Sequence, residues 1–222
     1  MVEEAREYRR SPRAWLKWSP PEYARSVFIN CPFDGEYLPI FRAIVFTVSV
    51  CGCVPRCSLE HDDASQVRLE KIYRLIGSSA FGIHDISRTE LDGENQLPRF
   101  NMPLELGFFL GAKQFGSGRH RSKRCLILDR GRYRFQKFIS DIAGQDIKAH
   151  SNSPETVIRT VRDWLRGAAG QGKLPGGSYL WGRYQQFTKD LPGLCKEAHL
   201  VPAHLTFRDL YELVLEWISL NR

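Results

Sequence analysis

The chain has 222 residues, of which 42% are hydrophobic and 26% are charged, and its formal net charge is +7. This composition is ordinary for a soluble globular protein, and the length is sufficient for one domain with extensions. The longest apolar run, residues 43–53, is interrupted by Thr47 and Ser49 and is too short to span a membrane. The N-terminus also lacks the basic-then-apolar order of a signal peptide. We therefore expect a cytoplasmic protein without membrane contact.

Strand and helix signals alternate along most of the chain. In chain order, apolar runs and helical periodicity predict strand 26–31, helix 34–52, strand 53–59, helix 65–79, strand 80–86, helix 101–113, strand 123–129, helix 133–143, short strand 146–149 and helix 155–166. This order favours an α/β fold with a doubly wound, mainly parallel, flavodoxin- or Rossmann-like sheet of about five strands.

Composition shifts divide the chain into four parts. Residues 1–24, with several prolines and tryptophans, are interpreted as an irregular arm, and residues 25–167 as the α/β domain. Residues 168–178 are interpreted as a glycine-rich linker. Residues 179–222 carry two helical patterns, the second with Thr206 as a possible cap, and form a helical C-terminal extension. This extension is either a small separate module or a helical hairpin packed on the sheet.

Two features can be interpreted either as purely structural or as functional. A basic segment, residues 119–134, is either a solvated loop or a surface for an anionic partner, a phosphate-bearing substrate or nucleic acid. Cys51, Cys53 and Cys57 form a C-x-C-x3-C pattern without a matching second cluster, which is a weak zinc signal. We expect no metal site.

Ligands of parallel sheets bind just beyond the carboxyl ends of the strands. The candidates there are Asn30, Cys31, Pro32, Phe33 and Asp34 after the first strand, Glu60 and His61 after the second, His84, Asp85 and Ser87 after the third, and Asp129 and Arg130 after the fourth. Asp34 is also a good N-cap, Asp85 is either a second acid or a partner of loop amides, and His84 is interpreted as a packed strand histidine.

Glu105 is the strongest single candidate. With Asn101 as N-cap and Pro103 near the first helical position, it falls in the first turn of an otherwise apolar helix. Apolar neighbours or nearby carboxylates would raise its pKa, and it could then act as a nucleophile or general base on a glycosidic carbon. The competing interpretation is helix stabilisation through the dipole, which contributes about 0.3–1 kcal/mol.

Two motifs together resemble the nucleoside 2-deoxyribosyltransferase superfamily. They are FINCPFD at residues 28–34 and LELGFFLGAK at residues 104–113. The related Toll/interleukin-1 receptor domains carry an NAD-cleaving glutamate on an equivalent helix. The resemblance implies that Glu105 is the nucleophile or oxocarbenium stabiliser and that Asn30, Pro32 and Phe33 line the base or ribose pocket. Arg99 stands where transferases carry an acid, which favours a phosphate-bearing substrate over base exchange on free deoxynucleosides.

We therefore expect an N-glycosidase that cleaves the ribosyl–base bond of NAD or another nucleotide or nucleoside, with the nucleotide as substrate and no cofactor. The expected catalytic residues are Glu105 and Asp85. The expected substrate-binding residues are Asn30, Pro32, Phe33, Asp34, Ser87, Arg99 and Asn101. The resemblance also implies a homo-oligomer or a protein partner in a bacterial antiphage defence system. The alternatives are a non-catalytic module that senses a nucleotide or binds a partner, and a nucleic-acid-associated protein that uses the basic segment.

Overall fold

The computed structural model describes residues 23–60, 63–89, 99–170 and 173–221, and it contains a five-stranded parallel sheet. The strands are β1 (Ser26–Asn30), β2 (Val54–Arg56), β3 (Phe81–Asp85), β4 (Arg124–Asp129) and β5 (Lys148–Ala149). Their order is β2-β1-β3-β4-β5, and every neighbouring pair is parallel. The doubly wound α/β fold predicted from the sequence is confirmed. Residues 1–22 of the predicted arm, the candidate His61 and residues 90–98 lie outside the described residues.

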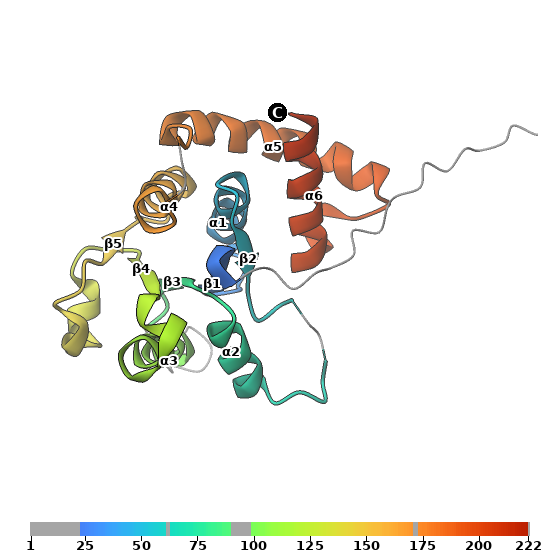
Figure 1. Cartoon of the computed structure of the whole chain (residues 1–222). Coiled ribbons are helices and arrows are strands. Elements are labelled where there is room, and N and C mark those ends of the chain that lie inside the picture. The colour runs from blue at the N-terminus through green and yellow to red at the C-terminus, as the bar shows by residue number, and fades with distance from the viewer. Residues whose placement is uncertain (1–22, 61–62, 90–98, 171–172, 222) are drawn as a thin grey trace, which may run out of the picture.

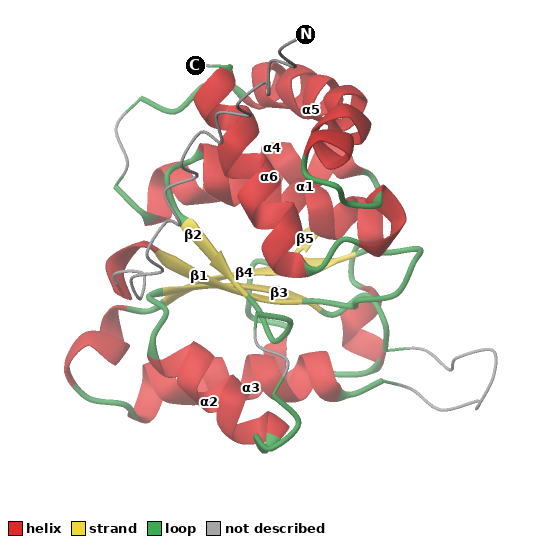
Figure 2. Ribbon diagram, turned by 90° about the vertical axis from the view of Figure 1, so that its right-hand side faces the viewer, coloured by secondary structure: helices red, strands yellow, loops and turns green. Residues whose placement is uncertain are grey.

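Helices cover both faces of the sheet (Figures 1 and 2). One layer contains α1 (Leu38–Val50) and α4 (Pro154–Ala168), and the other contains α2 (Arg68–Gly77) and α3 (Asn101–Phe115). Because the central strands are covered on both faces, every residue of β1 and β3 is buried. None of the described helices combines the length and the apolar character needed to cross a bilayer.

The C-terminal extension forms a third layer on α1 and α4. It consists of α5 (Gly177–Glu197) and α6 (Phe207–Leu220), which begins with a complete capping box between Thr206 and Asp209. Phe46 of α1 stacks on Phe187 at 5.4 Å and lies 5.8 Å from the ring of Trp217. The extension therefore shares the main hydrophobic core and packs mainly on α1 and α4.

Two predicted helices differ most from the structure. The first begins at Leu38 instead of Asp34, because residues 34–37 form a turn in which the Asp34 carboxylate accepts a hydrogen bond from the Tyr37 amide at 2.9 Å. The segment predicted as helix 133–143 contains two short 3-10 helices, Arg134–Lys137 and Ser140–Ile142. Ile139, which lies between them with a φ of −142° and a ψ of 72°, leaves the helical region and prevents a continuous helix.

We expect the extension to unfold together with the sheet. Phe187→Ala removes a fully packed ring and should lower the free energy of unfolding by about 3–5 kcal/mol. The matched control is Phe115→Ala on α3, where the ring is 88% exposed and the expected change is below about 0.5 kcal/mol. Urea unfolding followed by circular dichroism and by tryptophan fluorescence tests this. A separate early transition of the extension would contradict it.

Candidate functional site

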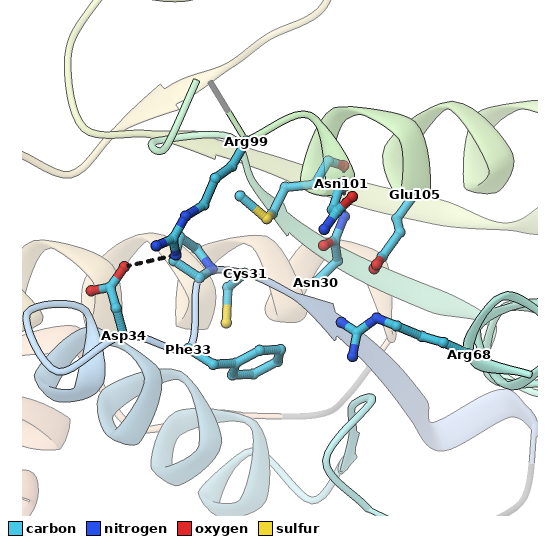
Figure 3. A pocket seen from close by; sticks show the side chains of 10 residues that line it. Asn30, Cys31, Phe33, Asp34, Arg68, Arg99, Asn101 and Glu105 are labelled. Carbon is cyan, nitrogen blue, oxygen red and sulfur yellow. Dashed lines mark hydrogen bonds and ion pairs between the residues drawn. The ribbon is translucent and has the colours of Figure 1, made fainter. Parts of the chain in front are cut away.

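A pocket of about 270 Å³ opens at the carboxyl edge of the sheet, where β1 ends (Figure 3). The chain leaves β1 toward β2 on one side, while β3 and β4 continue on the other, so this is the topological switch point of the sheet. Open parallel sheets bind their ligands in the crevice at such a point. The pocket is lined by Asn30, Cys31, Pro32, Phe33, Asp34, Arg68, Arg99, Asn101, Met102 and Glu105.

Three segments form the walls. Residues 30–34 continue directly from β1, residues 99–105 enter α3, and Arg68 is the first residue of α2. Each segment lies beyond a strand on the same edge, so the parallel topology alone brings them together. Seven of the nine predicted site residues line this pocket, namely Glu105, Asn30, Pro32, Phe33, Asp34, Arg99 and Asn101.

The Glu105 carboxyl group is buried and unpaired. Its residue is 8% exposed, and among the described residues it makes no hydrogen bond or ion pair. Burial raises the pKa of Glu105 from 4.5 to about 7, and the positive charge of Arg68 opposes this shift only in part. Figure 3 shows the guanidinium group of Arg68 reaching into the pocket below Glu105. A carboxyl group with a pKa near neutrality, lining a cleft, is poised for proton transfer or nucleophilic attack.

The predicted N-terminus of α3 is wrong by one residue. Phe100 occupies the N-cap without a side-chain cap, and Asn101 is the first helical residue. Glu105 consequently lies in the second turn, and the first turn of α3 contains no acidic residue. Because dipole stabilisation falls off within the first turn, capping does not explain why a carboxylate is buried here.

Asp34 and Cys31 are poor nucleophiles in this environment. Asp34 accepts two hydrogen bonds from Arg88, at 3.1 and 3.0 Å, and lies 3.9 Å from Arg99. Burial alone would raise the pKa of Asp34, but the hydrogen bonds from Arg88 and Tyr37 hold it below its usual value. Burial, with the charge of Asp85 as the next cause, raises the pKa of the Cys31 thiol well above its usual value. Asp34 is therefore committed to ion pairing, and Cys31 stays a neutral thiol.

The structure does not bring Asp85 and Ser87 into the pocket. Asp85 is fully buried and accepts hydrogen bonds from the Tyr37 hydroxyl at 2.7 Å, the Ser87 amide at 2.8 Å and His150 Nε2 at 2.9 Å. The Ser87 hydroxyl lies 3.1 Å from the same His150 nitrogen. This cluster ties the end of β3 to the residues after β5 and to the turn before α1. The geometry assigns both predicted site residues a structural role.

Two side chains of the pocket, Arg68 and Met102, are not among the residues predicted from the sequence. Arg68 is exposed, and it is the first residue of α2, after the loop that follows β2. That position places it at the carboxyl edge, which the alternation of strands and helices could have indicated. Met102 is buried, and its backbone carbonyl accepts a hydrogen bond from Asn30, a contact that no sequence pattern signals.

Much of the basic segment is used inside the fold. Lys123 is fully buried, and its ammonium group donates to the carbonyls of Ile76 and Ser79 at the end of α2. Burial lowers the pKa of Lys123 to about 8. Arg124 donates to the carbonyls of Gly167 and Ala168 at the end of α4, at 3.0 and 3.1 Å. These cations satisfy helix C-termini, where positive charge is favourable.

Within the described ranges, no group of three or more histidine, cysteine, aspartate or glutamate side chains could hold a metal ion. Comparison of the chain with protein-family models, curated proteins and solved structures finds no match.

Removing the buried charge should stabilise the protein in a pH-dependent way. Because the folded-state pKa of Glu105 is about 7 against a usual 4.5, folding becomes less favourable as pH rises from 4.5 through 7. Glu105→Gln should therefore gain stability relative to the parent by on the order of 2 kcal/mol between pH 5 and pH 8. Thermal or urea unfolding at both pH values measures this. The exposed-site control Glu212→Gln should show no such pH-dependent gain, and a flat difference for Glu105→Gln would contradict the assigned pKa.

Proposed function

We propose that the protein is an N-glycosidase that cleaves the ribosyl–base bond of NAD or another nucleotide. Glu105 would act as the nucleophile or as the carboxylate that stabilises an oxocarbenium-like transition state. The observation that carries this proposal is the unpaired, buried Glu105 carboxyl group in the pocket at the switch point of the sheet. The motif resemblance at residues 28–34 and 104–113 supports the same reaction class.

The chemistry requires an ionised carboxylate beside the anomeric carbon. The C1′–N bond breaks, its electron pair leaves with the base, and positive charge develops at C1′. Glu105 then either forms a C1′–O bond or stabilises the cation in a poorly solvated site, where charge interactions are strong. Water then attacks C1′, releases the Glu105 carboxylate where the C1′–O bond has formed, and loses one proton. A base that is uncharged in the nucleotide leaves as an anion and takes up this proton. Nicotinamide, which is a cationic pyridinium in NAD, leaves as a neutral molecule, and the proton passes to solvent.

Three features of the pocket favour a nucleotide as substrate. Its volume of about 270 Å³ lies just below the usual range of about 300–1,000 Å³ for small-molecule pockets, so it suits one nucleoside-sized part of a ligand. Phe33 is 37% exposed and offers a ring on which a base can stack. Arg68 and Arg99 supply two guanidinium groups, which suit phosphate oxygens.

We expect the purified protein to release free base from NAD or from nucleoside 5′-monophosphates, detected by chromatography. Glu105→Gln should lower this rate at least about a hundredfold, whereas the surface control Glu212→Gln should not. The rate should rise with pH through about 7 as Glu105 ionises, and fall about tenfold per pH unit below it.

Unphosphorylated nucleosides in the same panel should react more slowly, because they have no phosphate group for Arg68 and Arg99 to bind. Base release by both the parent and Glu105→Gln would contradict the assignment of Glu105. Nucleotide binding without any base release would identify the non-catalytic sensing module instead.

A further inference from the structure

The side-chain amide of Asn30 is fixed in one orientation. Its nitrogen lies 2.8 Å from the Met102 carbonyl oxygen and 3.1 Å from His84 Nδ1. A carbonyl oxygen only accepts hydrogen bonds, so the amide nitrogen, not the amide oxygen, must face Met102. One amide hydrogen is then used by Met102, and the other points at His84.

His84 can only serve as the acceptor in this contact. Its Nδ1 must be unprotonated to accept from Asn30, so the ring is neutral and carries its hydrogen on Nε2. The ring is fully buried between Phe28 and Phe109, at centroid distances of 5.8 and 4.9 Å. Burial, together with the charge of Lys123, lowers the pKa of His84 to about 3. The acceptor at Nδ1 therefore persists over the whole physiological pH range.

The ring of His84 has little freedom to move. Gly82 stands beside it on β3, and a Cβ atom at that position would lie 2.6 Å from Nε2 and 2.9 Å from the ring of Phe109. Only a glycine leaves room for both rings. His84 and Phe109 thus form a rigid support behind the Asn30 amide.

These bonds leave the side-chain oxygen of Asn30, Oδ1, available to a ligand in the pocket. It accepts no hydrogen bond from any described residue, and it is open to the pocket rather than sealed in the core. Met102, to which Asn30 is bound, lies one helical turn before Glu105 on α3. The pocket therefore presents a fixed hydrogen-bond acceptor close to the carboxyl group.

We propose that Asn30 accepts a hydrogen bond from the ribose 2′-hydroxyl, that His84 is its positioning residue, and that the pocket consequently selects ribonucleotides over 2′-deoxyribonucleotides. This inference rests on the proposed function, because it places C1′ at Glu105. The 2′-hydroxyl is the donor on the carbon adjacent to C1′. Hydrogen bonds to this hydroxyl strengthen as the oxocarbenium-like transition state forms.

Binding to the Glu105→Gln protein tests the inference without turnover. Isothermal titration with AMP against 2′-deoxyAMP, and CMP against 2′-deoxyCMP, should show the ribose form binding about tenfold more tightly. Adding His84→Phe, which keeps an aromatic ring at this position but removes the acceptor, should reduce the ratio to about one. The affinity for the deoxy form should stay within about twofold.

His84→Asn is the matched control, because its amide oxygen takes the place of Nδ1, and it should retain the preference. Circular dichroism checks folding, and Asn30→Ala should lose the same preference if the His84 variants do not fold. The inference would be overturned if the Glu105→Gln protein bound the ribose and deoxyribose forms equally, or bound neither. It would also be overturned if His84→Phe weakened the binding of both forms to the same extent.

Base release by the parent separates this inference from the proposed function. Equal release from ribose and deoxyribose substrates would overturn the role of Asn30 but keep the N-glycosidase. Selective binding of ribonucleotides without any base release would overturn the N-glycosidase but keep the role of Asn30.

Discussion

Burying a carboxyl group without a partner is unfavourable, and the fold holds Glu105 in this position by anchoring α3 through two apolar clusters. Leu106 packs into a cluster with Ile86, Ile127 and Phe135, while Phe109 packs into a second cluster with Phe28 on the sheet. These two anchors fix α3 against the sheet, and the helix places Glu105 in the pocket. The raised pKa follows from this placement, because burial disfavours the charged form and the positive charge of Arg68 compensates only in part. Sites of this kind trade stability for reactivity.

The polar groups at the carboxyl edge are divided between two compartments. One is the open pocket beyond β1, with Glu105, Asn30 and the two arginines. The other is the closed cluster of Asp85, His150, Tyr37 and Ser87, in which the carboxylate accepts bonds from the other three residues. The strand order explains the division. The connection after β1 leads to β2 on one side and the connection after β3 leads to β4 on the other, which leaves a crevice between them, whereas β3, β4 and β5 lie side by side.

The sequence predicted the sheet well because each buried strand is a short apolar run between turn residues, and even the two-residue strand Lys148–Ala149 was anticipated. The pocket lining was also largely predictable, because parallel strands send their following residues to one edge. The errors concern features that depend on tertiary contacts. Asp85 was indistinguishable in sequence from a catalytic acid, since its partners Tyr37 and His150 lie far away in the chain. His84 is predicted from the sequence to be a packed strand histidine, and only its contact with Asn30 in the structure connects it to the pocket.

The central claim is that Glu105 is held as a desolvated carboxyl group with a pKa near neutrality, and a direct titration tests it. Carbon-13 NMR of protein labelled at the glutamate side-chain carboxyl carbon follows each glutamate with pH, and the resonance missing in Glu105→Gln identifies this one. We expect its midpoint at about 7. A midpoint at the usual value of 4.5 would show that the carboxyl group is solvated, and it would contradict both the assigned role and the pH dependence derived from it.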